Sequence, residues 1–166
     1  MTSIKISVVV CTYNRSDILR KCLDSLTEQT VDKSLFEVIV VDNNSTDSTK
    51  EIVEEHCRRN SNFRYVLEEE QGHSQARNRG WKESKGEHVT YIDDDAYAKE
   101  KWIESIIKCF KETNADIVGG KISPYYSENE KLFPEWIKNF HGHGSWGEKR
   151  RKIEYPENKF GFSAGN

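Results

Sequence analysis

The chain has 166 residues, of which 25 are basic and 28 acidic, so its formal net charge at pH 7 is −3. This length fits one domain and is too short for two ordinary ones. The near balance of charge argues against a protein that binds nucleic acid through bulk positive charge. Four Trp, seven Tyr and seven Phe argue against a largely disordered chain, and we expect a domain with a substantial core.

No stretch of the sequence approaches the roughly 18 apolar residues that a transmembrane helix needs, and residues 1–5 lack the features of a secretion signal. The cysteines show no Cys-x-x-Cys spacing. Each of them falls on the apolar side of an expected strand or helix (Cys11, Cys22, Cys57 and Cys109). We therefore expect reduced core thiols in a cytoplasmic protein.

Strands and helices are expected to alternate along the chain. Apolar and β-branched runs predict strands at 4–11, 36–41, 63–67, 88–92 and 116–120. Helical spacing of apolar residues predicts helices from about Ser16, from a capping box of Ser48 and Glu51, after Gly72, and over 99–112. This alternation predicts a three-layer α/β/α fold with a mostly parallel sheet. From Lys121 the periodicity fades, which indicates a site-forming excursion.

Polar residues follow three of the expected strands. Thr12-Tyr13-Asn14-Arg15 follows the first, Asp42-Asn43-Asn44-Ser45 the second, and Asp93-Asp94-Asp95 the fourth. In an open α/β sheet, ligands bind beyond the carboxyl ends of the parallel strands. We therefore expect these three segments to converge on one site.

The three successive aspartates predict a cation site, because crowded carboxylates repel one another unless a cation or a donor offsets their charge. Alternation along a strand would direct Asp93 and Asp95 to one side and Asp94 to the other. Carboxylate oxygens suit a hard ion such as Mg²⁺ or Mn²⁺, which is often shared with a diphosphate. The alternatives are a solvated acidic turn and a phosphatase with an aspartyl nucleophile, although the sequence offers no convincing Lys and Ser/Thr pair for the latter.

Four segments, in this order, resemble the family 2 glycosyltransferases with the GT-A fold: Val8–Arg15, Glu37–Ser45, Gly72–Asn78 and Tyr91–Asp95. The resemblance implies transfer of a sugar, with inversion at the anomeric carbon, from a nucleotide-diphosphate donor. UDP-sugars are favoured as donors, and the acceptor is a hydroxyl of a saccharide or a lipid-linked saccharide. The family also implies cell-surface polysaccharide or glycan synthesis, in the cytoplasm or at the inner face of the membrane.

The resemblance further implies roles for single residues at the first two strand ends. Thr12, Tyr13 and Arg15 would bracket the base and the phosphates of the nucleotide. Asp42 is expected near the base. The next residue is Asp in many relatives and Asn43 here, which leaves open the residue that reads the base and the choice between UDP, dTDP and GDP.

At the other side of the expected site, Arg77 lies near the start of a helix and is expected to face the donor, whereas Arg79 is expected in solvent. Asp95 is the first choice of metal ligand, together with Asp93, for Mn²⁺ or Mg²⁺. Asp93 and Asp94 would also bond the ribose or metal-bound water. The ion would act as a Lewis acid on the departing diphosphate.

An inverting transfer needs a general base, which in the family follows a segment like Ser163-Ala164-Gly165-Asn166. We therefore expect the base beyond Asn166, and the chain to be one incomplete GT-A domain. Its nucleotide-binding half would be 1–120, and 121–166 would begin the acceptor-side region. The alternative is a nucleotide-sugar binding module without turnover.

Three features of the last 46 residues have weaker implications. His141 and His143 would add metal ligands, although histidines in Gly-rich segments are rarely ligands. The basic cluster at 148–152 suits a membrane surface, but a solvated loop is the commoner role of such a run. Trp136 and Trp146 fit an acceptor sugar and core packing equally well. No feature predicts the oligomeric state.

Overall fold

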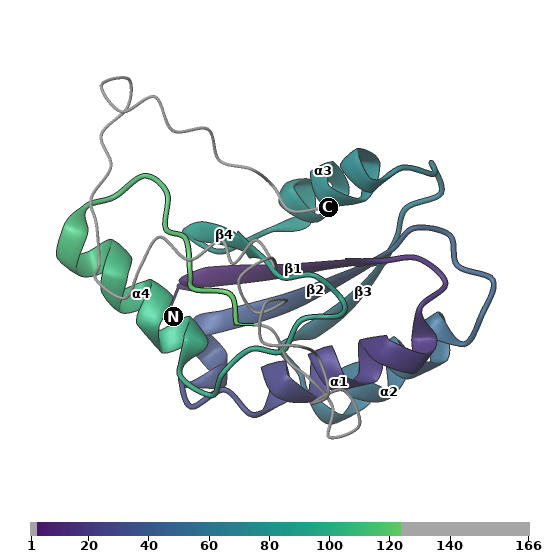
Figure 1. The fold of residues 1–166 in the computed structure, drawn as a ribbon, viewed down its shortest axis with the longest axis horizontal. Coiled ribbons are helices and arrows are strands. Elements are labelled where there is room, and N and C mark those ends of the chain that lie inside the picture. Colours follow the sequence, from purple (N-terminus) through teal and green to yellow (C-terminus); the bar gives the residue numbers. More distant parts are fainter. Residues whose placement is uncertain (1–2, 124–166) are drawn as a thin grey trace, which may run out of the picture. The chain divides into compact units, whose positions relative to one another are not determined.

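The structure is a computed structural model that describes residues 3–123 (Figure 1). Its elements lie within one compact unit that ends at Val118. In chain order they are β1 (Ile6–Thr12), α1 (Ser16–Thr27), a short 3₁₀ turn η1 (Lys33–Leu35), β2 (Phe36–Asp42), α2 (Thr49–Arg59), β3 (Phe63–Leu67), α3 (His73–Glu83), β4 (His88–Tyr91) and α4 (Trp102–Thr113). The first four expected strands are therefore confirmed, and their bounds shift by no more than two residues.

The four strands form one parallel sheet in the order β3-β2-β1-β4. Thr12 at the end of β1 is in register with Asp42 at the end of β2, and Asp42 is in register with Leu67 at the end of β3. The carboxyl ends of these strands are therefore level. Because all four strands run parallel, the polar residues that follow them emerge along one edge of the sheet.

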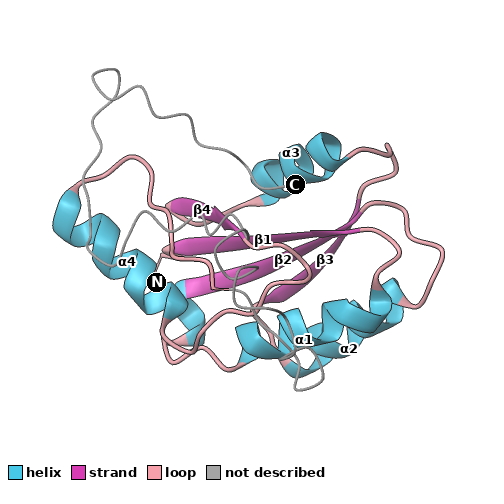
Figure 2. Ribbon diagram, in the orientation of Figure 1, coloured by secondary structure: helices cyan, strands magenta, loops and turns pink. Residues whose placement is uncertain are grey.

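Helices cover both faces of the sheet, as the alternation of β and α segments predicts (Figures 1 and 2). Val8 and Val10 pack with residues of α1, α2 and α4 on one face, whereas Val9 packs with Ala76 of α3 on the other. These valines are fully buried. Both faces of β1 must be apolar for that reason, which explains why this strand reads as a continuous β-branched run.

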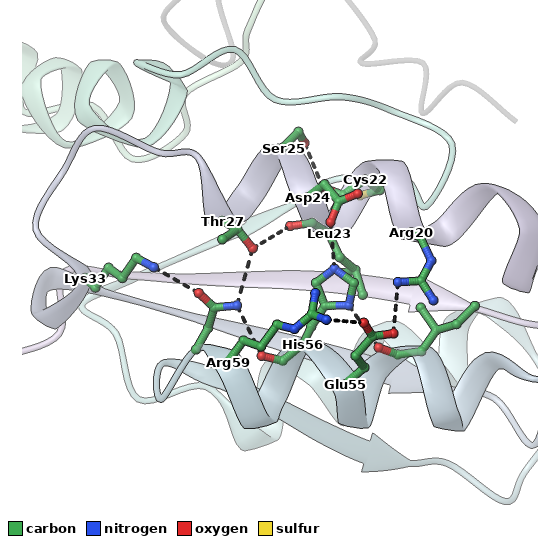
Figure 3. A network of polar contacts seen from close by, with 12 residues as sticks. Arg20, Cys22, Leu23, Asp24, Ser25, Thr27, Lys33, Glu55, His56 and Arg59 are labelled. Atoms are coloured by element: carbon green, nitrogen blue, oxygen red, sulfur yellow. Dashed lines mark hydrogen bonds and ion pairs between the residues drawn. The ribbon is translucent and has the colours of Figure 1, made fainter.

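Polar contacts between α1 and α2 fix the two helices that begin at the carboxyl edge (Figure 3). The buried His56 ring places Nε2 2.9 Å from Asp24 Oδ1 and Nδ1 2.9 Å from the Ile52 carbonyl oxygen. Arg20 donates to Glu55 at 2.9 Å. The His56–Asp24 and Arg20–Glu55 contacts join side chains from different helices, so they constrain the orientation of one helix relative to the other.

Two sequence expectations are wrong. Ser48 precedes α2, but its side chain makes no capping hydrogen bond; instead Asp47 Oδ1 accepts from the Thr49 amide at 3.0 Å. Residues 116–120 are not a strand, and the Ile117 side chain is 72% exposed. A strand needs a partner edge, and within residues 3–123 none pairs with this segment.

All four cysteines are free thiols; Cys22 is buried and the others are partly buried. Among the described residues, no helix has the length and apolar character needed to span a membrane.

Candidate functional site

The loops after β1 and β2 are held together by Asn14. This residue has a left-handed backbone (φ 51°), which Asn tolerates better than most residues. Its side-chain Oδ1 accepts from the Thr46 amide at 2.7 Å, and its own amide donates to Ser45 Oγ at 2.9 Å. The two loops expected to meet the nucleotide therefore form one structural unit.

Asp47 completes this unit by binding the first residues of two helices. Its carboxylate accepts from the amide of Ser16, where α1 begins, and from the amide of Thr49, where α2 begins, both at 3.0 Å. Desolvation raises the pKa of Asp47, but the hydrogen bonds from Thr49 and Ser16 outweigh it and lower the pKa to about 2. A carboxylate at two helix N-termini is stabilised by the amides and the dipoles of both helices.

Asp42 is buried and its two carboxylate oxygens have partners within the fold. Oδ1 accepts from the Ser45 amide and Oδ2 from the Tyr65 hydroxyl, both at 2.9 Å. Burial and this hydrogen bond to Asp42 raise the pKa of Tyr65. The carboxylate thus shapes the turn after β2 and anchors β3.

Asn43, 5% exposed, directs its side chain towards the loop that joins β3 to α3. Nδ2 donates to the carbonyls of Glu68 at 3.1 Å and Glu70 at 2.7 Å, and Oδ1 accepts from the Gly72 amide at 2.8 Å. Both donors of the amide are therefore used.

The aspartates after β4 lie in a turn and not in a continued strand, because β4 ends at Tyr91 and the Ala96 amide donates to the Asp93 carbonyl at 3.0 Å. Asp94 is buried, whereas Asp93 and Asp95 are exposed. Arg15, from the loop after β1, reaches across to this segment: its guanidinium lies 2.8 Å from Asp94 Oδ1 and 3.2 Å from Asp95 Oδ2. The first and fourth strand ends, 79 and 80 residues apart in these two pairs, therefore meet in one cluster.

Burial raises the pKa of Asp94 above its usual range, while Thr12 and Arg15 oppose part of the rise and Asp95 adds to it. The Thr12 hydroxyl makes no hydrogen bond of normal geometry, although it lies near enough to Asp94 to stabilise the carboxylate. Arg15 is therefore the principal partner of Asp94. The cluster is short of positive charge, because Arg15 faces two carboxylates.

Arg77 lies on the opposite side of the sheet edge from Arg15, on α3. Its guanidinium carbon is 3.9 Å from the centre of the Tyr91 ring, a cation–π contact, and its carbonyl accepts from the Tyr91 hydroxyl at 3.2 Å. Within residues 3–123 no carboxylate pairs with this guanidinium. Arg79 instead pairs with Glu83 at 3.0 Å and is half exposed, as the sequence predicts for a solvated neighbour.

The donor set at this edge fits a cation that is shared with a ligand. In the part of the chain that the structure describes, no group of three His, Cys, Asp or Glu side chains surrounds a common point. Asp93 and Asp95 offer two exposed carboxylates, and Mg²⁺ is typically held by one or two carboxylates together with substrate phosphates. Burial raises the pKa of the Cys11 thiol to about 11, although the nearby Arg77 guanidinium opposes part of the rise.

Sequence reasoning identified the strand ends but missed Asn14, Asp47, Tyr65 and Tyr91 as residues that shape the site. Asn14 and Asp47 had a signal, since Asn and Asp favour turns and helix starts. Tyr65 and Tyr91 had none, because their partners are distant in sequence. His141, His143, Trp136, Trp146, the cluster at 148–152 and residues 163–166 lie outside the described residues.

A family model described as "Glycosyl transferase family 2" matches residues 7–165. The chain belongs to this family. It is 37% identical over 122 residues to the glycosyltransferase AglE of Haloferax volcanii, covering 73% of this chain and 40% of AglE.

Solved structures show the same fold. TarS of Staphylococcus aureus with UDP has a TM-score of 0.65 and 33% identity, covering 74% of this chain and 38% of the TarS chain; TarS is described as a poly(ribitol-phosphate) beta-N-acetylglucosaminyltransferase. The Pyrobaculum calidifontis mannosyltransferase PcManGT, with GDP-Man and Mn²⁺, has a TM-score of 0.62 and 27% identity, covering 68% of this chain and 34% of that chain. The chain thus spans less than half the length of these relatives. The predicted family and GT-A fold are confirmed.

Proposed function

We propose that the protein transfers a sugar, with inversion, from a nucleotide-diphosphate donor to a hydroxyl of a saccharide or lipid-linked saccharide. The observation that carries the proposal is the cluster at the carboxyl edge, where Arg15 bridges to Asp94 and Asp95. Two exposed carboxylates, one bridging guanidinium and a second guanidinium on α3 match a ligand that has phosphates and an associated cation.

Within this site, Tyr13 and Thr12 would contact the base side of the nucleotide, Tyr13 through its ring, which is 46% exposed. Asp42 would hold the turn beneath the base, and Asp94 would bond the ribose. Arg77, unpaired with carboxylates among the described residues, would bind the diphosphate. Asp95 and Asp93 would hold Mn²⁺ or Mg²⁺, which when bound neutralises charge on the departing diphosphate.

UDP is the favoured nucleotide because TarS was solved with UDP and with UDP-GlcNAc, whereas the GDP-Man relative has lower identity. The TarS name supports an acceptor in a cell-surface polymer. Four free thiols support a reducing compartment such as the cytoplasm. The second candidate function is a nucleotide-sugar binding module without turnover, since no residue placed by the structure qualifies as the general base.

Calorimetric titration with UDP, GDP and dTDP, each with Mn²⁺, with Mg²⁺ and with EDTA, tests the proposal. We expect UDP to bind only when a divalent ion is present, and Arg77→Ala to weaken binding at least about tenfold, the loss of a charge-assisted contact. Arg79→Ala is the matched control, because Arg79 already pairs with Glu83. Absence of binding by all three nucleotides, or equal effects of the two Arg variants, would refute the proposal.

Turnover distinguishes the two candidate functions. Incubation of the protein with UDP-sugars and with saccharide acceptors, followed by measurement of released UDP, should give acceptor-dependent release if the protein is a transferase. Binding of UDP without any release would support the binding module.

A further inference from the structure

We propose that Asn43 is a positioning residue: its side chain holds the β3–α3 loop (Glu68–Gly72) and thereby sets the position of Arg77, and it does not read the nucleobase. The inference rests on the proposed function, because only that function makes Arg77 part of a nucleotide site. The hydrogen bonds that carry it belong to the fold and are independent of any ligand.

The amide of Asn43 is bound from three directions by main-chain groups. Two carbonyls, of Glu68 and Glu70, face its nitrogen, and one amide, of Gly72, faces its oxygen. Rotating the amide by 180° would point its oxygen at two carbonyls, so the partners determine the orientation. The main chain of Asn43 is also used: its N–H donates to the Thr12 carbonyl at 3.0 Å, and its carbonyl accepts from Gln71 Nε2 at 2.8 Å.

The β3–α3 loop has little else to hold it. Glu69, Glu70, Gln71 and Gly72 are exposed and Glu68 is half-buried, so apolar burial contributes almost nothing to the order of the loop. The Glu68 amide donates to the Asp42 carbonyl at 2.9 Å, which continues the strand ladder. Beyond that point, the main-chain bonds from the loop to the sheet end on the buried Asn43 side chain.

The connection runs from Asn43 through Gly72 to Arg77. Gly72 has φ 149°, a conformation that favours glycine, and its N–H is held by Asn43. Its carbonyl accepts from the Ala76 amide at 3.0 Å and so closes the first turn of α3. Arg77 follows Ala76 directly, so a displacement of Gly72 would displace the guanidinium from its place over Tyr91.

This arrangement uses both the donors and the acceptor of the Asn43 side chain. An aspartate at 43 has the same size but no N–H, so two hydrogen bonds would be lost and a charge would face two carbonyl oxygens. Because both donors are engaged, they are unavailable to a base as well. Base recognition must then come from other groups of the edge.

The test compares Asn43→Asp with Asn114→Asp, which makes the same chemical change at an exposed position after α4, near Lys5 and Glu87 and away from the carboxyl edge of the sheet. Hydrogen exchange of the amides of residues 68–77 and calorimetric binding of UDP and GDP with Mn²⁺ are measured in both variants. In Asn43→Asp we expect exchange at Gly72 to accelerate and the affinity for any nucleotide that binds to fall at least about tenfold, from the loss of two hydrogen bonds. Asn114→Asp should change neither quantity by more than about twofold. Unchanged exchange in Asn43→Asp, or tighter binding of UDP, would overturn the proposal.

A measurement on the unchanged protein covers the case in which Asn43→Asp does not fold. The side-chain NH₂ signals of Asn43 should exchange slowly with solvent and keep their NMR shifts when UDP, or the base-free analogue ribose 5-diphosphate, is added. Shifts that appear with UDP and not with the base-free analogue would show that Asn43 contacts the base, and would overturn the proposal. Failure of the protein to bind any nucleotide would instead refute the proposed function, while the exchange results would still test the role of Asn43 in the loop.

Discussion

Gly80 allows α3 to lie close against the sheet. Replacing it by alanine should destabilise the protein, although Gly→Ala within a helix usually stabilises. A Cβ at this position would stand 2.3 Å from Val9 Cγ1 and 3.2 Å from Val41 Cγ2. Both valines are fully buried in the sheet, so neither has free space to move into. The helix would have to shift away from β1 and β2.

The expected magnitude follows from two opposing effects. Gly→Ala in an ordinary helix interior stabilises by about 1 kcal/mol. Forcing an extra methyl into a packed core typically costs about 1–3 kcal/mol, and a contact as short as 2.3 Å places this site at the upper end. We expect Gly80→Ala to lower the free energy of unfolding by about 1–2 kcal/mol, equivalent to about 2–8 °C in the thermal midpoint.

Guanidinium chloride unfolding at 25 °C measures this change. Asn78→Ala, at an exposed position of the same helix, is the control and should be neutral or slightly stabilising because alanine is the better helix former. The double variant with Val9→Ala should show a favourable coupling of at least about 0.5 kcal/mol, because the methyl that clashes is then absent. A Gly80→Ala protein as stable as the wild type, or more stable, would refute the reasoning.

Other perturbations test the charged groups of the edge. Removing the guanidinium in Arg15→Ala should raise the pKa of Asp94 further above its usual range in a carbon-13 NMR titration, because burial then acts with less opposition; an unchanged titration would show that the pair does not form in solution. In calorimetry, Asp95→Asn should abolish the binding of UDP that Mn²⁺ supports. The thermal midpoint of the free protein should stay within about 2 °C, because the Asp95 side chain is 52% exposed. Hydrogen bonds hold the pKa of Asp47 at about 2, against an ordinary value of 3.8. Its stabilising contribution should therefore be complete above pH 4 and disappear as the pH falls towards 2. Unfolding curves across this range should show the difference between wild type and Asp47→Asn shrinking with acidity, and a constant difference would contradict the assignment.

Much of the fold could be predicted because its signals are local. Continuous β-branched runs such as Val8–Val10 identify strands that are buried on both faces. Leu19, Cys22, Leu23 and Leu26 recur at helical spacing and are all buried in α1. The fifth expected strand was wrong: within residues 3–123 no strand pairs with residues 116–120, and pairing depends on the whole sheet and not on local residue types alone.

The sequence by itself determined the alternation of strands and helices, the family, and the strand ends at which the polar residues gather. Those features depend on periodicity and on residue types within a few positions of one another. Only the tertiary structure decided how each polar side chain is used: Asn43 holds the β3–α3 loop, Asp42 binds Tyr65, and Arg15 bridges to Asp94 and Asp95. The physical reason is that a buried polar group takes whichever partner the packing of distant segments brings within hydrogen-bond reach, and that partner lies 23 residues away for Asp42 and 79 for Arg15.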